Sequence, residues 1–290
     1  MRDFSKYLTF GDDDKNWGIY LNVAGSYLAP PNMPYPSTSH PSGYFFNWEQ
    51  GRVLKEFQLN YITEGSGILE NEFGKFPVKP GSLIVTFPDV WHRYKPLTKT
   101  GWREHYIGFN GPIASQFMLY PLFSPERPVM HVGIKEELID TYYKIFDFVH
   151  SEKPGFQQIA SGMIIKLLGY LISFEKQKEF SGKRIADIIE DVRFKMRQNV
   201  ESQLQPELMA KDHCIGYSYF RKMFKKYTGV SPHQYHLELK IMRARELLLT
   251  TDKSIKEISF ELGFQSIHYF SRLFKNKVGQ NPSELRNKSN

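Results

Sequence analysis

The sequence lacks the features that mark secreted and membrane proteins. It holds a single cysteine, Cys214, so no disulfide can form within the chain. Its first residues do not have the basic-then-apolar pattern of a signal peptide. The most apolar stretch, residues 162–174, is interrupted by Lys166 and is too short to cross a bilayer. These absences predict a cytoplasmic protein that makes no membrane contact.

Net charge is almost absent from the first part of the chain and is concentrated in the last part. Of the whole chain's net charge of +7, residues 181–290 hold 20 Lys and Arg against 12 Asp and Glu, which leaves 18 against 19 in residues 1–180. A near-neutral part joined to a basic part is typical of a sensor attached to a domain that binds a polyanion. An ordinary solvated basic surface would carry the same charge, so the sequence pattern has to decide.

The basic part contains an internal repeat with a period of fifty residues. Residues 219–225 (YFRKMFK) align with residues 269–275 (YFSRLFK), and in the same register Gly229 aligns with Gly279. Aromatic, basic and glycine positions recur together, which indicates that one structural unit occurs twice.

Each unit of the repeat is predicted to be two helices with a sharp turn between them. In the second unit, Gly263 is placed to end the first helix and Ser266 to cap the next. A long helix over residues 232–250 is predicted to join the units. The second helix of such a pair suits insertion into a DNA major groove. The side chains predicted to contact DNA are Tyr217, Ser218, Arg221, Lys222 and Lys225 in the first unit, and Gln265, Ser266, Ile267, His268, Ser271, Arg272 and Lys275 in the second.

Several short sequences resemble the DNA-binding domain of the AraC/XylS family. The resemblance covers residues 186–287 and implies a transcription regulator whose two helix-turn-helix units bind double-stranded DNA. The chain departs from the family pattern at Ser259, where the family usually has alanine, and at Gly216, where its first recognition helix usually begins with serine. Glycine is still a tolerable N-cap, although it weakens the expectation of base contacts from the first unit. The matching stretches are GVSPHQY at 229–235, AREL at 244–247 with Leu248, IKEI at 255–258, GFQS at 263–266 and YFSRLFK at 269–275.

Residues 16–110 are predicted to form short strands separated by turns. Residues 57–62 alternate and are followed by a glycine-rich turn at 65–67. Regular short strands of this kind predict a β-sandwich or barrel. The order of these motifs, followed by Lys-Pro-Gly at 79–81 and by His92, resembles the cupin-like sensor domain that precedes AraC-type DNA-binding domains.

Many cupins are metal enzymes, which raises the alternative of a cupin-type isomerase or dioxygenase. Their metal site typically uses two His one residue apart, a carboxylate and a later His. The chain has no His-X-His sequence, and although His92 lies where the later His would be, residues 57–62 offer no partner. We therefore predict no metal, no cofactor and no catalytic residue. An effector-independent DNA-binding protein is the second alternative.

A loop-rich segment before the barrel combines aromatic rings with polar groups. Small-ligand pockets have apolar walls and a few convergent polar groups, and flat rings beside hydrogen-bonding groups suit a sugar. The same aromatic residues could instead pack the outside of the barrel. The predicted effector is a sugar or sugar derivative, and the predicted effector-binding residues are Tyr35, His40, Trp48, Arg52 and His92.

The expected organisation has two domains. Residues 1–178 form a mainly-β cupin-like barrel with appended helices, residues 179–185 form a linker, and residues 186–290 form an all-α domain with two helix-turn-helix units joined by a long helix. Apolar stripes within residues 135–178 would either cap the barrel or pair two subunits, and the family resemblance favours a homodimer. The predicted function is effector-controlled transcription regulation, activation rather than repression, with RNA polymerase as a further candidate partner.

Overall fold

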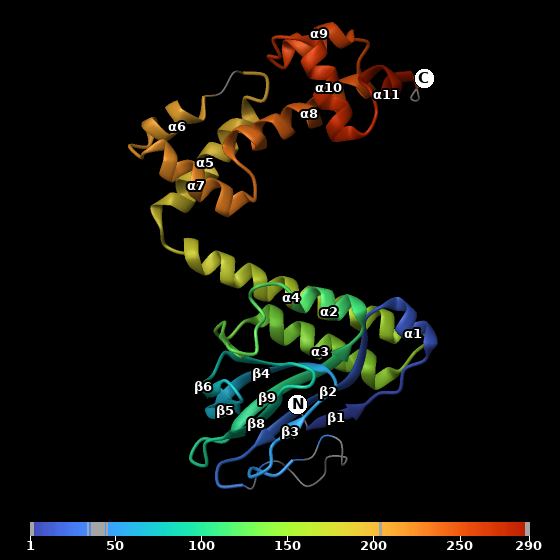
Figure 1. Cartoon of the computed structure of the whole chain (residues 1–290), viewed down its shortest axis with the longest axis vertical. Coiled ribbons are helices and arrows are strands. Elements are labelled where there is room, and N and C mark those ends of the chain that lie inside the picture. The colour runs from blue at the N-terminus through green and yellow to red at the C-terminus, as the bar shows by residue number, and fades with distance from the viewer. Residues whose placement is uncertain (1–2, 34, 36–43, 45, 203–204, 288–290) are drawn as a thin grey trace. The chain divides into compact units, whose positions relative to one another are not determined.

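The computed structural model describes residues 3–33, 35, 44, 46–202 and 205–287. The chain divides into two compact units, Met1–Glu175 and Lys176–Asn290, which are described separately below (Figure 1). Helical structure is interrupted at residues 181–183, between α4 (Phe156–Phe180) and α5 (Arg184–Gln198), inside the segment proposed as a linker. Among the described residues, no helix is long and apolar enough to cross a membrane.

The first unit is built on two antiparallel sheets. One has six strands in the order β1-β2-β9-β4-β7-β10, and the other has four in the order β3-β8-β5-β6 (Figure 1). This arrangement confirms the predicted mainly-β barrel. The strands are β1 (Phe4–Tyr7), β2 (Tyr20–Ala29), β3 (Arg52–Val53), β4 (Phe57–Gly65), β5 (Gly67–Asn71), β6 (Gly74–Val78), β7 (Ser82–Thr86), β8 (Trp91–Pro96), β9 (Trp102–Asn110) and β10 (Val129–His131).

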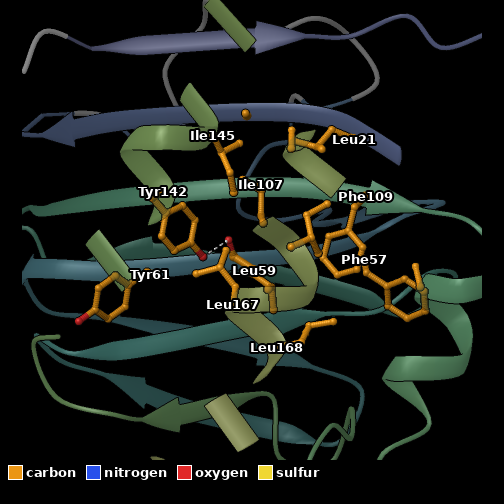
Figure 2. Close-up of a cluster of buried hydrophobic side chains, with 14 of the residues drawn as sticks. Leu21, Phe57, Leu59, Tyr61, Ile107, Phe109, Tyr142, Ile145, Leu167 and Leu168 are labelled. Carbon is orange, nitrogen blue, oxygen red and sulfur yellow. Dashed lines mark hydrogen bonds between the residues drawn. The ribbon is translucent and has the colours of Figure 1, made fainter. Parts of the chain in front are cut away.

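Alternation along the central strands separates two environments. On β4, Leu59 and Tyr61 belong to the main hydrophobic cluster, which also takes in side chains of α3 (Glu136–Ser151) and α4 (Figure 2). Successive side chains of a strand point to opposite faces, so the neighbouring Gln58 and Asn60 lie on the other face of the same sheet. The six-stranded sheet therefore has a helix-covered apolar face and a face that carries polar groups.

Hydrogen bonds as well as apolar packing attach the helices to this sheet. The Tyr142 hydroxyl of α3 donates to the carbonyl of Leu59 at 3.0 Å, as Figure 2 shows. The Gln157 side chain of α4 pairs with both backbone groups of Leu21, which lies at an irregularity in the pairing of β2 with β9. The helices of residues 135–178 thus cap the barrel. Two short helices complete the unit, α1 (Asp12–Trp17) and α2 (Pro112–Met118).

The second unit is all helical, and it confirms the predicted pair of helix-turn-helix units. Phe220 and Phe224 are buried in one hydrophobic cluster, and Phe270 and Phe274 are buried in a separate one, at positions related by the fifty-residue repeat. The long helix α8 contributes to both clusters. After α5, the helices are α6 (Pro206–Asp212), α7 (Tyr217–Thr228), α8 (Pro232–Thr250), α9 (Ile255–Glu261), α10 (Ile267–Val278) and α11 (Pro282–Asn287).

The turns of the second unit follow the local chemistry of the sequence. Gly263, just after α9, has φ +70°, a left-handed conformation that glycine adopts without strain. The Ser266 hydroxyl accepts a hydrogen bond from the amide of Tyr269 at 3.4 Å and so caps α10, as predicted. At the equivalent start of α7, Gly216 provides no side-chain cap. The helices α7 and α10 thus begin differently, the first without and the second with a side-chain cap.

Candidate functional site

A small cavity lies between the two sheets of the first unit, on the polar face of the six-stranded sheet. Its volume is about 20 Å³, which is room for about one water molecule. The lining side chains come from β1, β3, β4, β8 and β9 and from the segment that precedes β3. They are Tyr7, Tyr35, Tyr44, Phe46, Arg52, Gln58, Tyr94, Glu104 and Tyr106, and we call this cavity the barrel pocket.

Arg52 holds the centre of the barrel pocket. Its guanidinium donates hydrogen bonds to the Tyr94 hydroxyl at 2.5 Å, the Tyr44 carbonyl at 2.6 Å and the Gln58 side chain at 3.4 Å. It also lies 5.0 Å from the ring centroid of Phe46, within the range of a cation–π contact. Within the described part of the chain, Arg52 forms no ion pair, so its positive charge is held by neutral groups.

Glu104 places a carboxyl group in the same pocket. It is 4% exposed, and its Oε1 accepts a hydrogen bond from the Tyr35 hydroxyl at 3.0 Å. Its Oε2 is buried and has no hydrogen-bond partner among the described residues. Burial raises the pKa of Glu104 to about 7, although the Tyr35 hydroxyl, the Arg52 charge and the Asn60 side chain act in the opposite direction. Near neutral pH this carboxyl can therefore accept a hydrogen bond or donate one.

A second carboxyl, Glu56, is hydrogen-bonded to two side chains that line the barrel pocket. Its two oxygens accept hydrogen bonds from the Tyr44 hydroxyl at 3.0 Å and the Gln58 amide at 2.9 Å. Burial raises the pKa of Glu56, and these hydrogen bonds partly offset the rise. Both oxygens of Glu56 are thus occupied, whereas Glu104 keeps one oxygen available to a ligand.

His92 accepts a hydrogen bond from Arg52 on the side away from the pocket. Its Nε2 lies 3.2 Å from Nε of Arg52, and its Nδ1 lies 3.0 Å from the carbonyl of Val90. Burial and the nearby Arg52 charge lower the pKa of His92 to about 3, so the ring is neutral. Nδ1 then carries the proton and Nε2 accepts. His92 does not line the pocket itself, but it contacts Arg52 and stacks on the ring of Tyr94, which both do.

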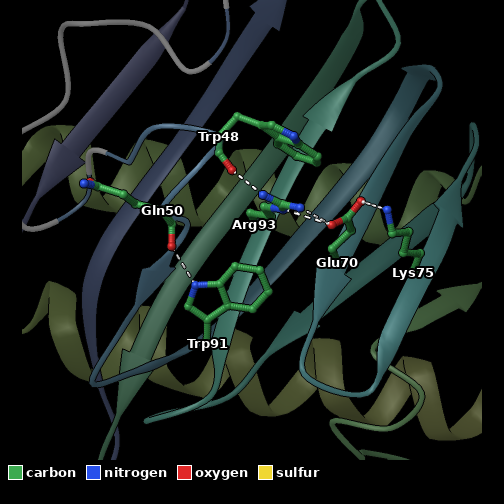
Figure 3. A network of polar contacts seen from close by, with 6 residues as sticks. All are labelled: Trp48, Gln50, Glu70, Lys75, Trp91 and Arg93. Carbon is green, nitrogen blue, oxygen red and sulfur yellow. Dashed lines mark hydrogen bonds and ion pairs between the residues drawn. The ribbon is translucent and has the colours of Figure 1, made fainter.

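Trp48 lies elsewhere, on the outer side of β8. The guanidinium of Arg93 is 4.4 Å from its ring centroid and the ammonium of Lys95 is 3.8 Å from it. Figure 3 shows the Arg93 side chain bridging the carbonyl of Trp48 and the carboxylate of Glu70. Of the residues predicted to bind an effector, the structure brings Tyr35 and Arg52 together with His92 behind them, and it does not bring Trp48 to them. His40 lies outside the described residues.

The sequence-based prediction missed Glu104, Tyr94 and Gln58. The available signal was on β4, where polar Gln58 and Asn60 alternate with apolar residues in a strand that is buried on both faces. Such a pattern predicts polar groups inside a barrel. Nothing local marks Glu104, because its position opposite Tyr27 and Ile62 follows from strand register.

The second unit presents two helix faces that suit DNA. In α7, Arg221, Lys222 and Lys225 are exposed, and in α10, Arg272 and Lys275 are exposed. Within the described ranges, no ion pair involves any of these five side chains, so their charges are available to phosphates. The other residues predicted to contact DNA are also accessible: Ser218, Gln265 and His268 are exposed, and Tyr217, Ser266, Ile267 and Ser271 are half-buried.

Comparisons with known proteins agree with this arrangement in both units. A family model described as the AraC-like ligand binding domain matches residues 35–142, and a helix-turn-helix domain model matches residues 209–288. The chain belongs to the AraC family. As an AraC-family protein it is a DNA-binding transcription regulator with a ligand-binding domain, and it is not an enzyme.

Full-length relatives of this AraC-family chain regulate operons. It is 27% identical to the Msm operon regulatory protein of Streptococcus mutans over 260 residues, which are 87% of this chain and 90% of that protein. It is 23% identical to the arabinose operon regulatory protein of Escherichia coli, over 80% of this chain and 81% of that protein. It is 22% identical to the lactose operon transcription activator of Staphylococcus xylosus, over 81% and 85% of the two chains.

Proposed function

We propose that this AraC-family regulator binds a small hydroxylated molecule in the barrel pocket and contacts DNA through α7 and α10. The observation that carries the first part is a half-buried cation and a buried carboxyl with one unpaired oxygen in the wall of one cavity. Arg52 is hydrogen-bonded only to neutral groups, without an ion pair among the described residues, and Glu104 has a buried oxygen without a hydrogen-bond partner. Buried polar atoms are seldom left unpaired, and a ligand hydroxyl would pair with this oxygen of Glu104.

The proposed effector is a sugar or sugar derivative. A hydroxyl both donates and accepts, which matches a guanidinium on one side and a carboxyl with a pKa of about 7 on the other. Tyr94 and Phe46 add aromatic faces to the wall. Relatives named for arabinose and lactose operons support this class. The cavity of about 20 Å³ is smaller than a monosaccharide, so binding includes displacement of wall side chains such as Tyr44.

The proposed regulator is a homodimer that activates transcription. On α4, Ile159 and Ile165 are exposed together with Gly162 and Gly169, and these four residues share one face of the helix. The two glycines have open space around them and would let the helix of a second copy approach closely. A relative named as a transcription activator supports activation. RNA polymerase is the further partner proposed for this regulator.

DNA binding by this regulator divides into two parts. The unpaired lysines and arginines of α7 and α10 contact phosphates and supply most of the affinity. The side chains at the leading ends of the two helices, such as Gln265 and His268 on the second, contact base edges and select the sequence. Effector binding shifts an existing equilibrium between states that engage paired DNA sites differently.

Thermal unfolding of the purified chain against mono- and disaccharides, including uronic acids, tests the effector class. A ligand at about a hundred times its dissociation constant stabilises the folded state by roughly 2.7 kcal/mol. We expect one sugar to raise the midpoint, and we expect Arg52→Met to abolish the rise. Trp48→Ala is the matched control, because Trp48 lies outside the barrel pocket. No rise with any sugar would refute the carbohydrate proposal and leave DNA binding untouched.

A further inference from the structure

A second, larger cavity lies within the C-terminal unit, between α8 and the turn that leads into α10. Its volume is about 420 Å³, and its wall includes His236 and Lys240 of α8 and Gln265 and Ser266 at the start of α10. It shares no residue with the barrel pocket. We call it the α8–α10 cavity.

Lys240 is the unusual member of the wall of this cavity. It is 7% exposed, and within the described residues it forms no ion pair. Burial lowers the pKa of its ammonium group, and no carboxylate of the described residues offsets the fall. The ring of Phe264 lies beside the ammonium, with its centroid 5.7 Å from Nζ. A buried charge without a counter-charge is costly, and a bound anion would remove that cost.

The other groups around Lys240 are donors or neutral polar atoms. His236 is 7% exposed, and burial lowers its pKa to about 4, although the backbone of Val200 and Asn199 acts in the opposite direction, so its ring is a neutral part of the wall. Ser266 caps α10, a helix of 12 residues, so the first-turn amides and the positive end of the helix dipole are at the cavity. A helix N-terminus combined with a lysine is a chemistry that binds phosphate oxygens.

We propose that the α8–α10 cavity binds a phosphate group beside the second recognition helix. Lys240 supplies the charge, and the start of α10 supplies hydrogen-bond donors. The phosphate has two possible sources, which are a backbone phosphate of the DNA that α10 enters and a free phosphate-bearing small molecule. The first source rests on the proposed DNA-binding function. The second does not, so failure of one leaves the other measurable.

The first measurement is thermal unfolding of the full chain in sodium phosphate and in sodium chloride at equal ionic strength. We expect phosphate to raise the midpoint of the wild type by a few degrees and to leave Lys240→Met unchanged. Methionine keeps the length of the side chain while removing a buried charge, so this variant should fold. Lys178→Met, at an exposed lysine on α4, is the control that loses the same charge and keeps the response.

The second measurement is the salt dependence of DNA affinity. If the phosphate belongs to DNA, Lys240→Met lowers the slope of log K against log salt by about 0.9, the value for one lost contact. If the slope is unchanged while the phosphate-induced shift is lost, the source is a free molecule. Equal slopes together with equal phosphate responses in wild type and Lys240→Met would show that Lys240 only packs against Phe264.

Two further variants guard against a loss of folding in Lys240→Met. Lys240→Arg retains the positive charge and should keep the response of the wild type in both measurements. Gln265→Glu places a carboxylate at an exposed position on the rim of the cavity, where it should weaken the phosphate-induced shift without disturbing the core. A full phosphate response in Gln265→Glu would contradict a phosphate site at the start of α10.

Discussion

The guanidinium of Arg52 donates a hydrogen bond to the imidazole of His92, with 3.2 Å between Nε and Nε2. The two residues lie directly opposite each other in the pairing of β3 with β8. The contact requires a neutral ring, because a protonated imidazole has no acceptor and would repel the guanidinium. His92 is therefore a positioning residue for the central cation of the barrel pocket.

This relationship predicts the behaviour of His92 variants. His92→Phe removes the acceptor, and we expect the free energy of unfolding to fall by about 1.5–3 kcal/mol, the usual range for a hydrogen bond to a charged group. His92→Gln can still accept at nearly the same place and should lose less. Urea denaturation of the full chain measures both. A smaller loss in His92→Phe than in His92→Gln would mean that ring packing rather than the hydrogen bond sets the effect.

Glu104 predicts a specific pH dependence of stability. Its pKa in the folded state is raised to about 7, above the ordinary value of about 4.3, so the folded state binds the proton more tightly. The stability it contributes is fully present below pH ~4.3 and is lost as pH rises toward about 7, with a slope of at most about 1.4 kcal/mol per pH unit. Glu104→Gln cannot titrate, so the difference in unfolding free energy between wild type and variant should change across that window.

The buried histidines work in the opposite direction. Burial lowers the pKa of His92 to about 3 and those of His105 and His236 to about 4, so the unfolded chain binds protons that the folded chain does not. Their contribution to stability is therefore lost as pH falls from about 6.5 toward those values. The wild type and the Glu104→Gln variant both contain these histidines. The difference between their unfolding free energies therefore reports the titration of Glu104 alone. A difference that stays constant from pH 5 to pH 8 would contradict the raised pKa.

Arg272 is predicted to contact a base or a phosphate from the second recognition helix. Arg272→Ala should weaken binding to a specific site by about 1–3 kcal/mol and relax sequence choice if the contact is to a base. Lys275→Ala is the comparison on the same helix, and it should weaken binding to all sequences about equally if it contacts a phosphate. Fluorescence anisotropy with specific and unrelated duplexes at moderate salt separates the two. Unchanged specific binding in Arg272→Ala would remove Arg272 from the interface.

Adjacent aromatic residues on α10 should differ sharply in their contribution to stability. Phe270 is fully buried, whereas Tyr269 is 43% exposed. We expect Phe270→Ala to destabilise the C-terminal unit by about 3–5 kcal/mol, through lost burial and the cavity left behind. Tyr269→Ala should cost far less stability, so any loss of DNA binding in this variant would reflect the surface. Thermal unfolding followed by DNA titration distinguishes the two roles.

The C-terminal unit was predictable because its information is local. Helical spacing, Gly263 after α9 and Ser266 before α10 all act within a few residues of the structure they determine. The fifty-residue repeat shows the same local pattern a second time, which supports the assignment of both units. The aromatic stripe at Phe270 and Phe274 could be assigned to the core from spacing alone, and both side chains are buried.

The barrel pocket was only partly predictable because it forms through long-range strand pairing. Arg52 lies on β3 and Tyr94 on β8, which pair in the four-stranded sheet. Glu104 lines the same pocket from β9 of the six-stranded sheet. Neither contact has a signature in a short window of sequence. Trp48 shows the reverse problem, since an aromatic residue beside polar ones suggested a stacking platform. Its ring instead covers Arg93 and Lys95 on the outer side of β8.

Strand β4 lies between the barrel pocket and the hydrophobic core under α3 and α4. Gln58 lines the barrel pocket. The carbonyl of the next residue, Leu59, accepts a hydrogen bond from the hydroxyl of Tyr142, which belongs to α3 on the helix-covered face. Protein interiors are close-packed, so a strand pushed aside by a ligand cannot move on one face alone. Any displacement that makes room in the barrel is thereby transmitted to the helical layer behind it, with no hinge, lid or loop required in between.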